Sequence, residues 1–251
     1  MQRRAILRHL STSLLAMPAL LPSRPAHALR PVDVELVLAV DVSRSVDPEE
    51  QELQFRGYAA AFRDSRLVEG IRNGPLGAIA VSFFTWSDWN MQELLVPWMV
   101  IDGPSSAGRF SEALEAAPRR AHLYTSISGA IDYASDLFGQ GYEGTRQVVD
   151  ISGDGVNNSG RPLAQARADA LRQGIVLNGL AVLDRTPPPP QFAALQPPLD
   201  DYYRDEVIGG PGAFLMVAEG FRAFDGAVRR KIIREIASHP GPGPLVERAF
   251  A

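Results

Sequence analysis

The feature that most constrains the fold is the apolar run Leu36–Val40, in which no residue is polar. A strand with one face in water alternates apolar and polar side chains, so an unbroken run predicts a strand buried on both faces. Such strands belong to parallel sheets whose two faces are covered by helices. We therefore expect Val34–Val40 to be a central strand of an α/β fold.

The segments that follow alternate between strand and helix patterns. Asp47 and Pro48 predict a helix start, and this helix is expected to run to about Leu67 before glycines break it. Gln92–Ile101 is expected to return as an antiparallel edge strand, because an edge tolerates Pro97. Further strands are expected at 78–84, 146–152, 175–183 and 213–218, helices at 106–116, 124–138, 162–173 and 221–238, and a helical turn at 200–207. The prediction is a doubly wound, mostly parallel, Rossmann-like sheet with helices on both faces.

The N-terminus has the pattern of an export signal. Arg3, Arg4 and Arg8 precede a largely apolar stretch, and Ala26–Ala28 supplies a small-x-small cleavage pattern. The paired arginines also fit twin-arginine export, and the apolar stretch is too short to span a membrane. We expect a signal peptide at 1–28, one domain at 29–240 and a C-terminal tail at 241–251. The protein is then periplasmic or secreted, and its mature part has no transmembrane segment.

Composition excludes several classes of function. The formal charge of −4 becomes −8 once the four arginines of residues 1–28 are removed, which argues against binding to nucleic acid. The absence of cysteine excludes disulfides, thiolate metal sites and a cysteine nucleophile. Nothing in the sequence fixes the oligomeric state.

Oxygen-bearing side chains occur where strands are expected to end. Asp41, Ser43 and Ser45 follow the first strand, Asp154 follows the strand at 146–152, and Thr125 opens a helix. In parallel sheets, ligands bind at the carboxyl ends of strands, near the switch in strand order. Carboxylate and hydroxyl oxygens suit a hard cation such as Mg2+, with Mn2+ or Ca2+ as alternatives.

The order Asp41-x-Ser43-x-Ser45, then Thr125, then Asp154 resembles the metal-ion-dependent adhesion site of von Willebrand factor type A domains. The order of elements from residue 34 to residue 238 resembles that domain as well. The resemblance implies that Ser43 and Ser45 bind the ion directly, that Thr125 does so when a ligand is engaged, and that the two aspartates hold it directly or through water. It also implies an open position that an acidic side chain of a protein partner fills, without catalysis.

Two features depart from the adhesion receptors. Gly153 stands where the family usually has threonine, and the loop that continues through residues 156–159 could reach the rim of the site. The segment 201–212 has no counterpart in those receptors, and it resembles a group of exported bacterial type A domain proteins of unknown function.

Other interpretations remain open from sequence alone. Asp41 and Ser45 could simply cap a helix, and the metal could be purely structural in a scaffold. A metal-assisted hydrolase acting on a phosphoryl or acyl group is the alternative function, although general acid–base candidates are few. Trp86 and Trp89 could line a rim or cover the core. The cations of the last helix, at positions 229, 230, 231 and 234, are expected on its solvated face.

Overall fold

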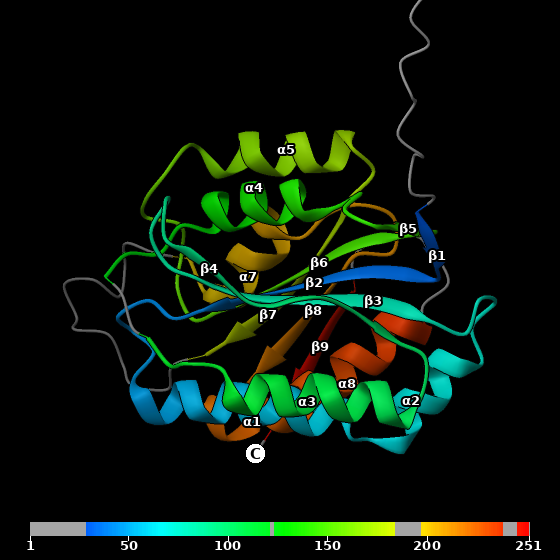
Figure 1. The fold of residues 1–251 in the computed structure, drawn as a ribbon. Coiled ribbons are helices and arrows are strands. Elements are labelled where there is room, and N and C mark those ends of the chain that lie inside the picture. The colour runs from blue at the N-terminus through cyan, green and yellow to red at the C-terminus, as the bar shows by residue number, and fades with distance from the viewer. Residues whose placement is uncertain (1–28, 121–122, 184–196, 238–244, 251) are drawn as a thin grey trace, which may run out of the picture.

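A seven-stranded sheet forms the middle layer of the molecule (Figure 1). The computed structural model describes residues 29–120, 123–183, 197–237 and 245–250. The expected signal peptide and most of the connector at 186–198 lie outside these ranges. In spatial order the strands are β4 (Gln92–Ile101), β3 (Ile79–Trp86), β2 (Val34–Asp41), β6 (Gln147–Gly153), β7 (Val176–Val182), β8 (Phe214–Ala218) and β9 (Leu245–Ala249).

Only β4 runs against its neighbour, and every other pair in this sheet is parallel. The expected fold class, with its antiparallel edge strand containing Pro97, is therefore confirmed. A separate parallel pair, β1 (Arg30–Val32) with β5 (Tyr142–Gly144), was not expected. These strands are only three residues long, which is too short to show a periodic pattern.

Helices cover both faces of the sheet (Figure 1). One layer holds α1 (Pro48–Phe62), α2 (Ser65–Arg72), α3 (Pro104–Ala116) and α8 (Phe224–Ala237), which the short turn η2 (Phe221–Ala223) precedes. The other holds α4 (Ile127–Leu137), α5 (Leu163–Arg172), α7 (Leu199–Tyr202) and the π-helical turn η1 (Tyr203–Val207). Within the described part of the chain, none of these helices has the length and apolar character needed to cross a membrane.

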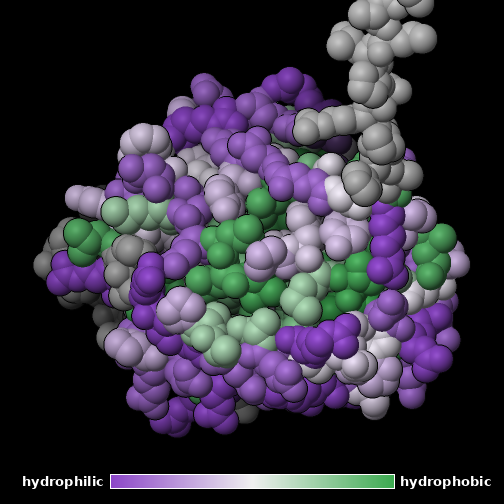
Figure 2. Space-filling view, in the orientation of Figure 1, coloured by the Kyte–Doolittle hydropathy of each residue, from purple (hydrophilic) through white to green (hydrophobic). Residues whose placement is uncertain are grey.

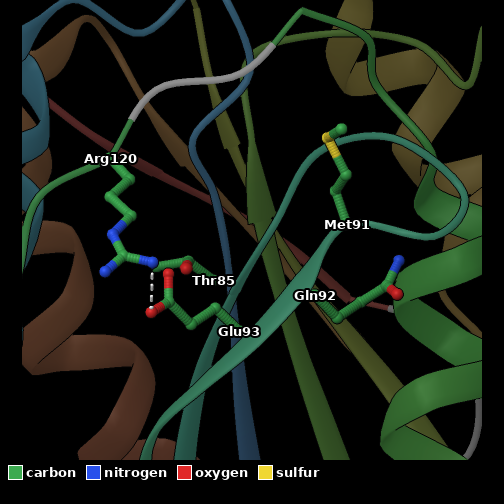
Figure 3. A pocket seen from close by; sticks show the side chains of 5 residues that line it. All are labelled: Thr85, Met91, Gln92, Glu93 and Arg120. Atoms are coloured by element: carbon green, nitrogen blue, oxygen red, sulfur yellow. Dashed lines mark ion pairs between the residues drawn. The ribbon is translucent and has the colours of Figure 1, made fainter.

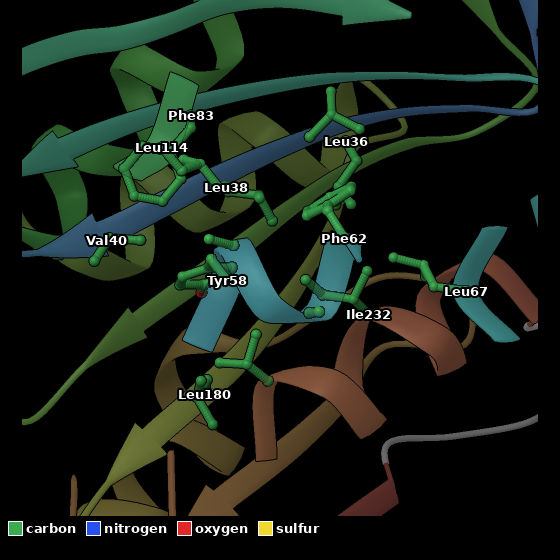
Figure 4. Packing of buried hydrophobic residues seen from close by; sticks show 14 of the residues in the cluster. Leu36, Leu38, Val40, Tyr58, Phe62, Leu67, Phe83, Leu114, Leu180 and Ile232 are labelled. Atoms are coloured by element: carbon green, nitrogen blue, oxygen red, sulfur yellow. The ribbon is translucent and has the colours of Figure 1, made fainter. Parts of the chain in front are cut away.

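The hydrophobic clusters on the two faces of β2 explain the unbroken apolar run. Leu36, Leu38 and Val40 point toward α1 and α8, where they meet Tyr58 and Ile232 among others (Figure 4). The intervening residues Val37 and Ala39 face the α4–α5 layer. All eight residues of β2 are buried, as the sequence predicts for a central strand.

The first helix is shorter than predicted. It ends at Phe62, and a second helix begins at Ser65 instead of the chain continuing to Leu67 in one helix. Asp64 starts this second helix by accepting a hydrogen bond from the Arg66 backbone N–H at 2.9 Å. The cap redirects the chain so that α2 can pack against α8.

The segment expected to be a tail belongs to the sheet. β9 pairs in parallel with β8, and the carbonyl of Ala249 accepts a hydrogen bond from the Glu219 N–H at 2.9 Å. Arg248 adds ion pairs with Glu219 and Asp200. The sheet thus continues beyond residue 240, where the domain was expected to end.

Lys231 corrects a further expectation. It was assigned to the solvated face of the last helix, yet its side chain is completely buried. Arg230 is exposed, and Arg229 and Arg234 are partly exposed. Lys231 instead points into the core toward Asp150, which lies on β6.

Candidate metal centre

The candidate site lies where strand order switches. β2 pairs with β3 on one side and with β6 on the other, so connections leave this point in opposite directions and open a crevice at the carboxyl ends. Asp41 is the last residue of β2, and Asp154 directly follows the last residue of β6. Two aspartates far apart in sequence thus meet at one edge because their strands are parallel neighbours.

Hydrogen bonds connect Asp41, Ser43, Ser45 and Asp154 in turn. The Ser45 hydroxyl donates to Asp154 Oδ1 at 2.7 Å, and the hydroxyl oxygens of Ser43 and Ser45 lie 3.2 Å apart. Asp41 Oδ1 accepts the Ser43 backbone N–H at 2.7 Å, which turns the chain sharply after β2. The loop therefore presents both serines toward the end of β6.

Thr125 is brought to the same place by the loop after β6. Its N–H donates to Asn158 Oδ1 at 2.9 Å, and its carbonyl accepts the Asn158 N–H at 2.8 Å. A side chain at Gly155 would begin 3.5 Å from Thr125 Oγ1, so this glycine adjoins the threonine hydroxyl. All five predicted residues thus converge at one edge of the sheet, and Thr125 is 5% exposed.

The electrostatics of Asp41 fit a bound cation. The residue is fully buried, and its Oδ2 has no hydrogen-bond partner within the described ranges. Burial, followed by the negative charge of Asp154, raises the pKa of Asp41 well above its usual value, and hydrogen bonds from Ser43 and from the Asp154 backbone oppose this. A buried carboxylate without a countercharge is costly, and a cation at this point would supply that charge.

The donor set favours a hard ion. It comprises two carboxylates and three hydroxyls, and the described residues contain no cluster of three or more His, Cys, Asp or Glu side chains. Neutral hydroxyl oxygens must therefore complete any coordination sphere here. Such oxygen-only sets suit Mg2+, Mn2+ or Ca2+ more than soft metals.

Tyr203 and Gly153 form a part of the site that sequence reasoning missed. A Cβ on Gly153 would lie 2.7 Å from the Tyr203 hydroxyl and 2.9 Å from Asp41 Oδ2, both impossibly close. Burial, then the charges of Asp41 and Asp154, raises the pKa of Tyr203 well above its usual value, so the phenol stays neutral. Gly153 and the segment 201–212 both depart from the adhesion receptors, and the structure links them. The turn η1 places the Tyr203 hydroxyl in the space that a side chain at residue 153 would need.

The loop at 156–159 holds neighbouring segments of the site in place. Besides holding Thr125 through Asn158, it holds the start of α4, where Asn157 Oδ1 accepts the Ser128 N–H at 2.9 Å. The Ser159 carbonyl accepts the hydroxyl of Ser126, the N-cap residue of α4, at 2.9 Å. Asn158 is exposed beside Thr125, so it stays a prediction that side chains of this loop reach the rim.

The rim carries one exposed cation and several exposed apolar side chains. Arg44 is exposed between the two serines and forms no ion pair with any residue in the described ranges. Trp89 is 61% exposed, Leu123 67% and Tyr124 54%, whereas Trp86 is part of the core. A cavity of about 590 Å³ lies here, lined by Arg44, Val46, Asp47, Pro48, Asp88, Met91, Leu123 and Tyr124.

A second, smaller cavity of about 330 Å³ lies at the start of β4, on the other side of Met91 (Figure 3). Glu93 and Arg120 form an ion pair of 2.9 Å there, so its charges are already matched. Thr85 and Gln92 also line this cavity. It offers no converging oxygen ligands comparable to those at the ends of β2 and β6.

The fold is that of von Willebrand factor type A structures. A von Willebrand factor type A structure from Catenulispora acidiphila superposes with a TM-score of 0.54 at 12% identity, covering 82% of this chain and 43% of that one. Proximal thread matrix protein 1 from the mussel byssus, with a zinc-occupied MIDAS motif, gives 0.56 at 13%, covering 83% and 49%. The pilus adhesin SpaC from Lactobacillus rhamnosus GG gives 0.56 at 14%, covering 83% and 31%.

These likenesses establish the fold, and this chain spans less than half the length of each of the three proteins. The chain belongs to the family described as protein of unknown function DUF1194, which matches residues 31–240. No curated protein sequence is similar to it.

Proposed function

We propose that this protein is exported and binds a protein partner through a divalent cation held by Asp41, Ser43, Ser45, Thr125 and Asp154. The observation that carries the proposal is the fully buried Asp41 Oδ2, which has no hydrogen-bond partner in the described structure and lies where three segments deliver oxygen ligands. The mussel byssus protein, which has the same fold, carries zinc at its MIDAS motif. That relative supports metal binding at this edge, and we expect Mg2+ as the ion here.

The chemistry of the ligands favours recognition of an acidic group. Three neutral hydroxyls and two carboxylates would leave a bound divalent ion electrophilic toward one further oxygen ligand. A carboxylate from a partner has the charge and hardness that such a position prefers. The guanidinium of Arg44, which forms no ion pair with any described residue, lies at the rim and would attract the same group.

The apolar rim suggests what accompanies that carboxylate. Leu123 and Tyr124 are largely exposed beside Thr125, and they line the cavity of about 590 Å³ together with Met91. An apolar side chain adjacent to the acidic residue of the partner would fill this cavity and bury surface on both proteins. The proposed partner segment therefore contains an acidic residue next to a large apolar one.

We propose binding in preference to catalysis. No histidine falls within the described ranges, and the single lysine is buried beneath the sheet. Among the described residues, the candidate centre offers its two aspartates as titratable groups for general acid–base chemistry, together with the buried Tyr203. A hydrolase remains the competing function, and it makes a different experimental prediction.

Calorimetry with Mg2+ and Mn2+ tests the shared premise. The mature protein is expected to bind one ion, and Ser43→Ala and Asp41→Ala are expected to weaken binding at least tenfold. Ser135→Ala is the matched control, because that hydroxyl on α4 only bonds the Ile131 carbonyl. Binding that is unchanged in both site variants would show that the ion sits elsewhere.

Capture from periplasmic extract separates the functions. A protein partner should be retained with Mg2+ and released by chelator, and Asp41→Ala should not retain it. Capture that ignores chelator would instead indicate a purely structural metal. Turnover of phosphoesters or acyl esters by the wild type that disappears in Asp154→Ala would favour the hydrolase.

A further inference from the structure

A buried group of charges lies between β6 and α8, away from the metal edge. Lys231 on α8 has its Nζ 2.6 Å from Asp150 Oδ1 on β6, and it donates a hydrogen bond to Glu235 one turn later on the helix. The three side chains are between 0 and 1% exposed. Nothing in the proposed metal-dependent binding uses them.

The residue type at position 231 is unusual for this chain. Lysine and arginine together number 25, and Lys231 is the single lysine. Arginine stays protonated in proteins, whereas a buried lysine can lose its proton and become a nucleophile. The chain thus places its one potential amine nucleophile in its core, 5.1 Å from the ring of Phe214.

Two buried carboxyl groups face the amine of Lys231, so one of the carboxyls is favoured as the neutral acid. Burial, followed by the charge of Glu235, raises the pKa of Asp150 to about 7, although Lys231 opposes this. A second cation, Arg146, interacts with the charge of Glu235, and its guanidinium donates to the Glu235 backbone carbonyl at 2.6 Å.

Glu235 is fixed beside the amine. Asn178, the neighbour of Asp150 in the sheet, donates from Nδ2 to Glu235 Oε1 at 3.3 Å. Asn178 is itself held, since its Oδ1 accepts the Phe214 N–H at 3.0 Å. The carboxylate is thereby positioned to exchange a proton with the amine of Lys231.

Lys231 is in direct contact with the Asp150 carboxyl group. Its Nζ lies 2.6 Å from Oδ1, and no other described residue is a hydrogen-bond partner of either Asp150 oxygen. The carboxyl carbon is one C–O bond beyond Oδ1, so the amine is already adjacent to the atom that it would attack. The surrounding core excludes the water that would compete with the amine.

We propose that Lys231 and Asp150 condense to form an intramolecular isopeptide bond, with Glu235 as the group that transfers the proton. The neutral amine attacks Cγ of the protonated Asp150 carboxyl, and an N–C bond forms. Glu235 takes a proton from the nitrogen and returns it to the departing hydroxyl, the C–O bond breaks, and one water molecule leaves. Net charge and oxidation state are unchanged, and no external reagent is required.

The cross-link would remove the desolvation cost of two buried ionisable groups and add a covalent restraint between α8 and the sheet. A neutral amide replaces a buried amine and carboxyl group, whose desolvation is costly. The bond would also join α8 covalently to a central strand of the sheet.

Intact-mass spectrometry of the purified mature protein tests the proposal. The expected mass is below the sequence mass by one water, and a peptide map should show one branched peptide that contains both Lys231 and Asp150. A folded wild-type protein at its full sequence mass, with both peptides unbranched, would overturn the proposal. No variant has to fold for this result to be decisive.

Three variants separate the proposed bond from other dehydrations. Lys231→Met should keep its full sequence mass, and Glu235→Gln should remain unreacted while it still folds by circular dichroism. Asp150→Asn should lose ammonia and reach the same product mass as the wild type. Loss of water that persists in Lys231→Met would identify a cyclised aspartate and contradict the cross-link.

Discussion

Gly153 and Tyr203 share one small volume beside Asp41, so each limits what the other position can hold. The contacts a Cβ would make with the Tyr203 hydroxyl and Asp41 Oδ2 are closer than atoms tolerate. The glycine is therefore a steric requirement of this chain. The threonine that is usual here in von Willebrand factor type A domains would not fit while Tyr203 is present.

Gly153→Ala is expected to destabilise the protein by about 1–3 kcal/mol through overpacking. Urea unfolding measures this change, and Tyr203→Phe should reduce the penalty in the double variant, because the nearest clashing atom is removed. Gly108→Ala on α3 is the control, since nothing lies within 4 Å of its added Cβ. Equal penalties with and without the Tyr203 hydroxyl would contradict the shared-volume explanation.

Asp41 is the residue at which metal binding and folding stability are coupled. Its buried carboxylate has an unpaired oxygen within the described structure, so charge at this point opposes folding when no ion is bound. Asp41→Asn is expected to raise the melting temperature in chelator and to abolish the stabilisation by Mg2+. Differential scanning calorimetry in both conditions checks it, and a variant less stable than wild type in chelator would argue against an unpaired charge.

Asp64 governs the break between two helices. Hydrogen bonds from Arg66 lower the pKa of Asp64 from 3.8 to about 2. Because the folded value is below the unfolded one, the charged cap stabilises the fold above pH 4, and this stabilisation is lost as the pH falls toward 2.

Asp64→Ala is therefore expected to cost about 0.5–2 kcal/mol at neutral pH, as cap removal generally does. The difference from wild type should shrink as unfolding is measured from pH 4 down toward pH 2. Ser65→Ala at the next position is the control and should change little. A penalty independent of pH across this range would mean that the charge of Asp64 is not what stabilises α2.

Most elements could be predicted from the sequence, because long strands and helices carry strong periodic patterns. β2 and the antiparallel edge strand β4 are examples, and so is the convergence of Asp41 with Asp154 at neighbouring strand ends. The burial of Lys231 could not be predicted, since helical spacing places it near charged neighbours and only the tertiary partner Asp150 reveals its direction. Tyr203 was missed for the same reason, because its role depends on a contact with a glycine fifty residues earlier in the chain.

β9 is the edge strand on one side of the sheet. It pairs with β8 along the full length of that strand, Phe214–Ala218, which is entirely buried. Removal of the chain after residue 244 would leave the backbone groups of an apolar strand unpaired, which promotes association between edges.

The truncated protein is expected to unfold at a lower temperature and to form oligomers, detected by light scattering. Arg248→Ala is the control, because it removes the ion pairs with Asp200 and Glu219 but keeps the strand. A truncated protein that remains monomeric and equally stable would show that β9 adds nothing to the sheet.

Metal binding should be visible in the stability of the whole molecule. At a free Mg2+ concentration about one hundred times the Kd, the stabilisation is about 2.7 kcal/mol. For a domain of this size this corresponds to a rise in Tm of about 5–10 °C. Thermal melts with Mg2+ and with chelator measure it, and Ser135→Ala should show the full rise whereas Ser43→Ala should not.

The parallel pairing of β2 with both β3 and β6 has a mechanical consequence. A partner held at the carboxyl ends of these strands would pull along the strand axis, away from β1 at the opposite end of the sheet (Figure 1). Such a load acts in shear on the hydrogen bonds of both ladders at once, so they must break together and cannot open one after another. If a partner binds at this edge as proposed, these two ladders would together oppose tension along the strand axis.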